Sequence, residues 1–439
     1  MIETSSNMGF GSKKIAVIGG GLGGMAFVNA ALYAGLENIQ LYEQAPEFTE
    51  VGAGVNITKN ANVVLDAYGL KEAMREKSSH EPPFYMQYRN YKTGEVFGQI
   101  DEFGFPATRQ IHRAHLLDVM RNRVPGSILN TGKRLAAIER SKSNKEYILK
   151  FQDGTTATAD IIIGCDGIKS AVRAHLGFAD QPNYSGQMVY RGYVEYSDLS
   201  PEADLELRKT VIYRGKQRHV LTLPIGNDLS KTSRVGVIGF MTEPLEDWVS
   251  ESWMAKAPVD KLAEQVEGWA PTVQEIIAGL RKNAARDGND LILKQALYVR
   301  DPIPKWYKVE DSQPGSGIIL VGDSAHSTLP HQGQGACMAI ESGVALATIL
   351  KNWKSDDLES AFSFYQTIRK PRTDKITKTS YEAGKLASAD TPELTSETFN
   401  PDALRERMKW IMDYDVLKDV YEQGVPYFET STTQVQAQL

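Results

Sequence analysis

The sequence predicts an α/β protein of two lobes with a helical segment towards its C-terminal end. Three observations carry this prediction. A short apolar strand near the start runs into a glycine-rich turn and a helix, which is how a parallel, doubly wound sheet begins. Two later apolar runs, in residues 161–167 and 317–323, also end in glycine and aspartate. Between them, residues 187–241 alternate polar and apolar side chains as antiparallel strands do. A chain of 439 residues is also too long for one small core.

The first strand, Ile15 to Ile18, ends in the pattern Gly19-x-Gly21-x-x-Gly24 within "KKIAVIGGGLGGMAFVNAALYAGLENIQLYEQ". The first glycine permits the tight turn, the second lets the backbone approach a pyrophosphate, and the third lets helix and strand pack closely. A second strand then leads to Glu43, whose carboxylate is placed to accept hydrogen bonds from a ribose. This βαβ unit predicts a bound dinucleotide without separating FAD from NAD.

Two further strand ends carry polar residues. "ADIIIGCDGIKSAVR" breaks from an apolar run into Asp166 and Gly167, and "GIILVGDSAH" repeats the arrangement with Asp323. The carboxyl ends of parallel strands meet at one edge of the sheet, where such folds bind ligands. We therefore expect these residues to lie beside the dinucleotide. The glycine-punctuated loop "EVGAGVNITKNA", which contains Gly54, is either part of the same site or an ordinary turn.

Composition excludes several classes of protein. The 49 basic and 55 acidic side chains form no long basic stripe, which argues against a nucleic-acid partner. The two cysteines, Cys165 and Cys337, are far apart and offer neither a disulfide framework nor a CxxC pair. The polar start lacks the features of a signal peptide and no apolar run reaches 18 residues, so the sequence predicts a cytoplasmic protein without a membrane span. Asp323, His326 and His331 do not stand in a metal-binding pattern, and we expect no metal.

Four motifs in order give the chain a resemblance to a known family: "GGGLGG" with Glu43, "IHRAHLLDVM", "CDGIKSAVR" and "GDSAHSTLPHQGQGACMAIESG", with the helix "YQTIRKPR" as a fifth. They resemble the group-A flavoprotein monooxygenases, which are single-component FAD-dependent aromatic hydroxylases. The resemblance implies a discontinuous, Rossmann-like FAD-binding lobe and a substrate lobe built on an antiparallel β-sheet. The expected division is 13–80, 106–185 and 295–375 for the FAD-binding lobe, 81–105 and 186–294 for the substrate lobe, 376–430 for C-terminal helices, and flexible ends at 1–12 and 431–439.

The resemblance also implies roles for individual residues. The ADP half of FAD is expected at the glycine pattern and Glu43, and Arg113 and Asp323 are expected at the flavin-side phosphate and ribityl chain. Asp166 and Gly167 belong to a motif that serves both FAD and the passing nicotinamide of NADH or NADPH. The residues predicted to bind FAD are Gly19, Gly21, Gly24, Glu43, Gly54, Arg113, Asp166, Asp323, Gly335 and Ala336, with Gly333 beside the last two.

In this family the reduced flavin forms a C4a-hydroperoxide that transfers OH to an electron-rich ring, so the cofactor carries the difficult step. Three residues are predicted to act on the substrate: Arg191 beside the flavin, His219 as acceptor or relay of the phenol proton, and His331 above the ring. A surface salt bridge is the alternative for Arg191, and a hydrogen-bonded core histidine is the alternative for His219. His326 is expected to be structural.

Within the family, "EVGAGV", "RHVLTLPI", "LPHQGQGA" and "TSYEAGKL" are most similar to salicylate-hydroxylase-like enzymes, which hydroxylate at the carboxylate-bearing carbon and release carbon dioxide. Residues 235–248 contain no arginine or lysine where a bacterial salicylate hydroxylase is expected to hold the carboxylate, and Arg214, Arg218 or His331 is the expected substitute. Salicylate, 4-hydroxybenzoate, 6-hydroxynicotinate, and a carboxylate-free phenol or polyketide-type aromatic all stay open as substrates. A flavin-dependent halogenase and a non-catalytic flavoprotein are less favoured hypotheses for the same FAD-binding fold.

The amphipathic C-terminal helix, with Leu404, Met408, Ile411 and Met412 on one face, packs either in the core or in a homodimer contact.

Overall fold

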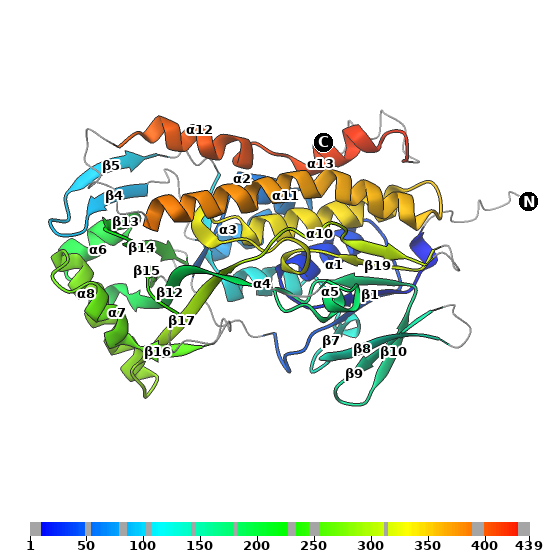
Figure 1. Ribbon diagram of the computed structural model, residues 1–439, viewed down its shortest axis with the longest axis horizontal. Coiled ribbons are helices and arrows are strands. Elements are labelled where there is room, and N and C mark those ends of the chain that lie inside the picture. Colours follow the sequence, from blue (N-terminus) through cyan, green and yellow to red (C-terminus); the bar gives the residue numbers. More distant parts are fainter. Residues whose placement is uncertain are drawn as a thin grey trace, which may run out of the picture.

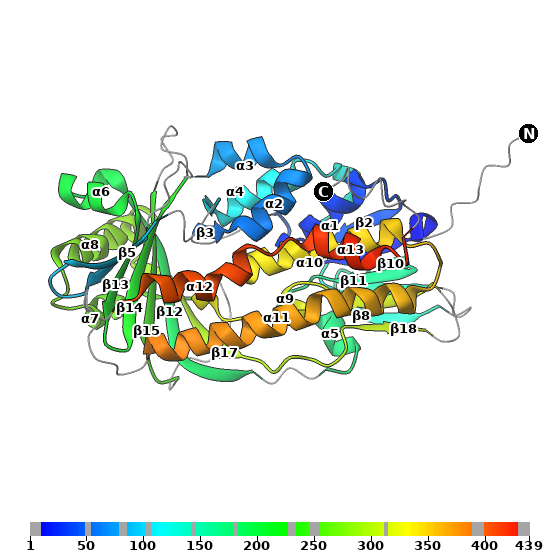
Figure 2. The same cartoon turned by 90° about the horizontal axis from the view of Figure 1, so that it is seen from above.

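The computed structural model describes residues 10–48, 54–78, 86–101, 107–141, 146–178, 182–226, 234–245, 255–310, 315–388 and 399–428. The predicted flexible ends lie mostly outside these ranges, as does most of the turn after Ile225. Two large sheets lie at opposite ends of the molecule, and long helices run between them (Figures 1 and 2). No helix within the described ranges is long and apolar enough to cross a membrane.

The first sheet has six strands and is parallel except at one edge, where β18 runs antiparallel to β19. Each of its central strands is a four-residue run that is buried throughout or nearly so, as expected of a parallel sheet covered on both faces. In spatial order the strands are β18 (Tyr307–Val309), β19 (Gly317–Leu320), β11 (Ile161–Gly164), β1 (Ile15–Ile18), β2 (Ile39–Tyr42) and β7 (Leu129–Asn130).

Helices cover this sheet, and α1 (Leu22–Tyr33) packs closely on α10 (Gly335–Asn352). The close approach depends on Gly343, because a Cβ there would lie 2.5 Å from the carbonyl oxygen of Gly23. The other helices on this side are α2 (Lys59–Ala67), α3 (Lys71–Lys77), α4 (Arg113–Arg121), α5 (Ala171–His175), α9 (Asp323–His326) and α13 (Val416–Gly424).

Two small antiparallel sheets accompany the parallel sheet. One joins β3 (Gly54–Ile57) to β6 (Arg109–His112), and the other joins β8 (Leu135–Arg140), β9 (Tyr147–Phe151) and β10 (Thr156–Ala159). Short 3-10 turns complete the region at Phe10–Ser12, Gly126–Ile128 and η4 (Pro330–Gln332), with a further turn at Tyr196–Asp198 in the other half of the molecule.

The second sheet has eight strands and is antiparallel with one exception. Strand β13 pairs parallel to β4, which the sequence did not predict because β4 comes from a segment more than 100 residues earlier. The strands in spatial order are β16 (Lys256–Pro258), β17 (Leu291–Val299), β12 (Asn183–Glu195), β15 (Arg234–Thr242), β14 (Arg218–Ile225), β13 (Thr210–Gly215), β4 (Met86–Asn90) and β5 (Val96–Ile100).

The helices α7 (Val259–Gln265) and α8 (Pro271–Arg286) cover one face of the eight-stranded sheet, with α6 (Pro201–Leu207) at its side. The side chains that pack against these helices come from alternate residues of each strand, among them Val211, Tyr213, Val220 and Val237. The intervening residues of the same strands therefore point to the other face. That other face looks towards α10 and α11 (Figure 2).

The helix α11 (Leu358–Ser388) runs along the molecule from the parallel sheet to the eight-stranded sheet (Figure 2). It continues through Pro371 and through residues 375–376, where the sequence placed a lobe boundary. The helix α12 (Pro401–Met412) lies beside β5 and packs Met408, Ile411 and Met412 against Met338 of α10. The apolar face of α12 thus packs in the core, which is the first of the two alternatives that the sequence left open for it.

Candidate active site

The glycine turn after β1 has the geometry that a bound dinucleotide needs. Gly19 has φ +105°, and a Cβ there would lie 2.3 Å from the carbonyl oxygen of Cys165. A Cβ on Gly24 would lie 2.1 Å from the carbonyl oxygen of Gly19, so helix and turn meet backbone to backbone. By contrast, a Cβ on Gly21 would meet no protein atom within 4 Å. Gly21 is also the N-cap of α1 and no side chain caps that helix, which leaves its N-terminus open to a phosphate.

Glu43 follows β2 at the same edge of the sheet. Its Oε2 accepts a hydrogen bond from the backbone N–H of Gly20 at 2.7 Å, and its Oε1 accepts one from Ala45 at 2.8 Å. The carboxylate is therefore held beside the glycine turn. Each oxygen keeps a further lone pair for a ribose hydroxyl.

Gly54 and Arg113 lie on the elements that face the eight-stranded sheet. Gly54 begins β3, and a Cβ there would lie 2.7 Å from a side-chain carbon of Ile225 in β14. Arg113 is the first residue of α4, whose N-cap His112 accepts a hydrogen bond from Ala114 N–H. Both positions thus lie on the side of these elements that faces the eight-stranded sheet.

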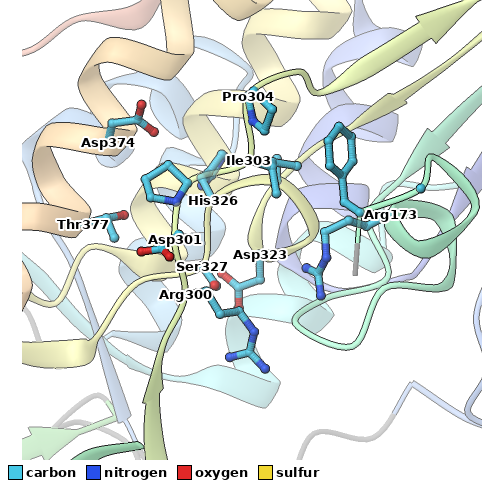
Figure 3. Close-up of a pocket in the computed structure, with 14 residues that line it drawn as sticks. Arg173, Arg300, Asp301, Ile303, Pro304, Asp323, His326, Ser327, Asp374 and Thr377 are labelled. Carbon is cyan, nitrogen blue, oxygen red and sulfur yellow. The ribbon is translucent and has the colours of Figure 1, made fainter. Parts of the chain in front are cut away.

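Asp323 occupies the first turn of α9, after β19, and three arginines surround it. Burial raises the pKa of its carboxyl, and the charges of Arg113, Arg300 and Arg173 oppose that rise. Figure 3 shows Arg173 and Arg300 on different sides of Asp323. They line a pocket of about 290 Å³, with Gly177, Phe178, Asp301, Pro302, Ile303, Pro304, Ala325, His326, Ser327, Asp374 and Thr377. The cationic surroundings suit a phosphate-bearing ligand.

The carboxylate of Asp166 holds the turn between β11 and α5 in place. It accepts hydrogen bonds from the Ser170 hydroxyl and from the N–H groups of Ala171 (2.7 Å) and Val172 (3.1 Å) at the start of α5. Gly167 follows with φ +77°. The carboxylate thus anchors this turn beside Gly19, and a contact with the cofactor would come from the turn as a whole.

Strand register brings the predicted substrate residues to one face of the eight-stranded sheet. Phe240 of β15 pairs with His219 of β14, which pairs in turn with Arg214 of β13. Arg191 of β12 pairs with Ile238, two residues from Phe240 and therefore on the same face. This is the face opposite α7 and α8.

His219, Phe240 and His331 form a row of three rings. The imidazole of His219 stacks on Phe240 with ring centres 4.5 Å apart, and Phe240 lies 5.3 Å from the ring of His331 on η4. Burial lowers the pKa of His219 to about 3 and that of His331 to about 4. Both imidazoles are therefore neutral at pH 7 and able to accept a hydrogen bond. The buried Nε2 of His331 has no hydrogen-bond partner among the described residues.

Arg191 is buried, with 8% of its surface exposed, so the alternative of a surface salt bridge does not apply to it. Its guanidinium donates to the side-chain oxygen of Gln295 at 2.6 Å. Burial, and then the charge of Arg113, lower the pKa of Arg191 to about 9. The group links the substrate face of the sheet to the start of α4.

The histidines after β19 do not converge on Asp323. His326 is buried, with Nε2 2.9 Å from the hydroxyl of Ser342 in α10, whereas His331 packs against Phe240. In the parts of the chain that the structure describes, no group of three or more His, Cys, Asp or Glu side chains is placed to hold a metal ion.

The sequence did not predict a buried ionic network behind the start of α10. Glu341, fully buried, accepts hydrogen bonds from Arg369 at 2.6 Å and Arg372 at 2.8 Å, both on α11. It also accepts from Asn60 at 2.6 Å, and Asn60 donates to Gln334 at 3.1 Å. Gln334 is the N-cap of α10, directly before Gly335 and Ala336. The only signal in the sequence was the motif "YQTIRKPR", which carries both arginines.

Comparison with known proteins agrees with this geometry. A family model described as FAD binding domain matches residues 12–380. A 6-hydroxynicotinate 3-monooxygenase of Pseudomonas fluorescens is 31% identical over 390 residues, covering 87% of this chain and 94% of that protein. A salicylate hydroxylase of Pseudomonas putida is 29% identical over 436 residues, covering 93% and 94%. A solved salicylate hydroxylase substrate complex, 28% identical, superposes with a TM-score of 0.74 over 93% of this chain and 97% of the other.

The open glycine turn, the carboxylate of Glu43 and the arginines around Asp323 fit a dinucleotide that carries phosphates and a ribose. The family model covers this region and the substrate face of the eight-stranded sheet together. The chain therefore belongs to the FAD-dependent aromatic-ring monooxygenases, which use FAD as cofactor and NAD(P)H as co-substrate.

Proposed function

We propose that the chain hydroxylates an aromatic acid carrying a ring hydroxyl, of the kind named for its relatives, salicylate and 6-hydroxynicotinate. FAD, once bound and reduced by NAD(P)H, supplies the activated oxygen. The protein binds the ring, fixes its orientation, excludes water and accepts a hydrogen bond from the ring hydroxyl. The relatives are named monooxygenases or hydroxylases, so neither a halogenase nor a non-catalytic flavoprotein is proposed.

The observation that carries the proposal is the row formed by His219, Phe240 and His331. Its centre, Phe240, is apolar and buried, and its two ends offer neutral imidazoles. A neutral imidazole accepts a hydrogen bond from a phenol hydroxyl and relays its proton, and the negative charge that develops on the ring oxygen makes the ring more reactive towards an electrophile. We assign this hydrogen bond and the relay of the phenol proton to His219, and a contact with the substrate to His331. The second role uses an Nε2 atom that has no partner in the described parts of the chain.

Arg191 has a different role in the proposal. A buried guanidinium near Arg113 gives the inner end of the substrate face a positive charge. A positive charge there favours anionic substrate and oxygen atoms at the reacting end of the ring. Gln295 holds the guanidinium in place.

For the cofactor we propose contacts from the glycine turn and Glu43 to the ADP half, from Arg113 and Asp323 to the flavin half, and from the start of α10 to the isoalloxazine. The last contact rests on Gly333, with φ +64°, followed by the helix N-terminus at Gly335 and Ala336. The lobe boundaries given by the sequence stay predictions. So do a homodimer, which light scattering on the purified protein tests, and a cytoplasmic location, which cell fractionation tests.

The test is a panel of hydroxylated aromatic acids and neutral phenols added to purified FAD-loaded protein. Substrate-stimulated NADH or NADPH oxidation is measured together with oxygen consumption and product mass. We expect one oxygen atom gained by the product, or the carboxyl group replaced by hydroxyl. Basal oxidation with every compound would overturn the proposed function.

Two variants separate the roles. His219→Ala is expected to lower turnover, and Arg191→Ala is expected to lower the fraction of NAD(P)H coupled to product, with FAD retained in both. Arg218→Ala is the control, because Arg218 donates to Gln265 of α7 on the opposite face of the same sheet. Loss of FAD from either variant would contradict the assignment to the substrate face.

A further inference from the structure

Arg214 lies at the outer end of the proposed substrate face. It is the ladder partner of His219, so the two side chains point to the same side of the sheet. Its guanidinium donates to the backbone carbonyl of Leu386, near the end of α11, at 3.0 Å. That carbonyl is neutral, and among the described residues Arg214 has no carboxylate partner.

A second arginine reaches the same place from another element. Arg407 belongs to α12, which packs across the outer strands of the sheet (Figures 1 and 2). Both guanidinium charges act on the hydroxyl of Tyr88 in β4, and the charge of Arg407 also acts on Arg214. The Nε of Arg407 is buried without a hydrogen-bond partner, and within the described ranges Arg407 makes no ion pair.

Burial makes this arrangement costly unless an anion completes it. Two like charges close together repel each other, and desolvation adds to the cost of each. The pKa of Arg214 is lowered by burial and by Arg407, while burial raises the pKa of Tyr88 to about 12 and keeps its hydroxyl a donor. The groups gathered here, two guanidinium ions and a phenol, all donate hydrogen bonds.

We infer that Arg214 and Arg407, together with Tyr88, form the binding site for the carboxylate of the aromatic substrate. A planar carboxylate accepts two parallel hydrogen bonds from a guanidinium, and a second cation accounts for its remaining lone pairs. The inference rests on the proposed function, since it names the part of the substrate that lies beyond His219.

The other candidates that the sequence offered for this role are less suitable. Arg218 is one residue from His219 and therefore points to the other face, where both its hydrogen bonds go to Gln265. His331 is neutral because burial lowers its pKa to about 4. Arg191 lies towards Arg113 and the proposed flavin site.

The experiment measures dissociation constants of salicylate and 6-hydroxynicotinate with the FAD-loaded protein by calorimetry. The matching carboxamides, which have the same ring and no charge, serve as probes of ring binding alone. Arg214→Gln and Arg407→Gln are expected to weaken binding of the acids about tenfold or more, which is the usual loss for a charge-assisted pair, and to change binding of the amides less than about twofold. Arg218→Gln is the matched control and is expected to change neither. Arg407 lies on a half-exposed helix face, so its variant keeps the test valid if Arg214→Gln fails to fold.

Unchanged binding of the acids in both variants would overturn the inference, as would equal losses for acids and amides, or no binding of either acid to the unaltered protein. The binding assay needs no turnover. If the acids bind through the arginines but do not stimulate NAD(P)H oxidation, the proposed function is overturned and the carboxylate site is still supported. Turnover of neutral phenols without binding of either acid would overturn the carboxylate site and the choice of an aromatic acid as substrate, and would leave the hydroxylase activity itself supported.

Discussion

Gly384 on α11 sets the position of the His331 ring, and its replacement by alanine gives a sharp prediction. A Cβ on Gly384 would lie 2.5 Å from both Cδ2 and Nε2 of the imidazole. Carbon atoms do not approach that closely, so the ring must move away from the helix and therefore shift against Phe240. Overpacking of this kind costs about 1–3 kcal/mol. Alanine in a helix recovers about 0.5–1 kcal/mol relative to glycine. The expected net effect of Gly384→Ala is a loss of up to about 2.5 kcal/mol in the free energy of unfolding.

Without the imidazole of His331, Gly384→Ala is expected to stabilise the protein instead of destabilising it. With His331→Ala already in place, the methyl group of Gly384→Ala meets no imidazole, and only the gain of about 0.5–1 kcal/mol from helix propensity remains. The assay is urea unfolding of all four proteins, followed by circular dichroism, with the slope against denaturant checked for constancy. A coupling of about 1–3 kcal/mol between the two positions is expected for residues in direct contact.

The same pair of backgrounds reports on function. Gly384→Ala is expected to raise KM for the aromatic substrate when His331 is present and to leave KM unchanged when it is absent. Equal changes in stability in both backgrounds would refute the contact, and an unchanged KM beside a clear stability coupling would refute the assignment of His331 to the substrate.

Three further predictions concern the cofactor turn and the buried histidines. Gly24→Ala places a methyl group 2.1 Å from the carbonyl oxygen of Gly19 and should prevent folding. Gly21→Ala should leave the stability of the FAD-free protein towards urea unchanged and weaken FAD binding. Equal losses of stability in the two variants would contradict this prediction. Glu43→Ala removes acceptors from two backbone N–H groups and should weaken FAD binding about tenfold or more, measured by flavin fluorescence on dilution. His219, His326 and His331 have pKa values of about 3, about 3 and about 4 in the folded protein, below the ordinary 6.5, so the unfolded chain binds more protons and stability falls as pH drops from about 6.5 towards 4. Each histidine adds about 1.4 kcal/mol per pH unit to the dependence of stability on pH. The urea midpoint of His326→Gln should therefore change less with pH than that of the unaltered protein. An equal dependence on pH would contradict a buried, neutral His326.

The sequence predicted those parts of the fold that depend on neighbouring residues. The strands at Ile15–Ile18 and Ile39–Tyr42 and the glycine turn between them are local patterns, and the structure reproduces them. The parallel pairing of β4 with β13 was not predictable, because nothing in either strand specifies a partner more than 100 residues away. The length of α11 was not predictable either: the motif "YQTIRKPR" indicated a helix as far as Arg372, but proline usually ends a helix, and only packing lets this one continue to Ser388.

The residues of the candidate site also differ in whether local sequence alone could place them. Glu43 and Asp323 could be placed from the strands that precede them, since a strand end fixes where the next side chain lies. The row from Arg214 through His219 to Phe240 needs the register of three strands, and a shift of one residue in any of them would turn its side chain to α7 and α8. Arg407 joins that row from a helix that follows the strands by more than 150 residues.

The network around Glu341 shows how distant segments support the proposed flavin contacts. A fully buried carboxylate is stable here because two arginines of α11 and the amide of Asn60 supply donors for it. Asn60 in turn donates to Gln334, whose own amide donates to Thr58 at 3.0 Å. The orientation of the residue before Gly335 therefore depends on charges in the helix that also presents Gly384 to His331. Since α11 is one continuous helix, a displacement near Arg369 would be transmitted to both the start of α10 and the substrate face, which gives the fifth sequence motif a physical role in aligning the two halves of the site.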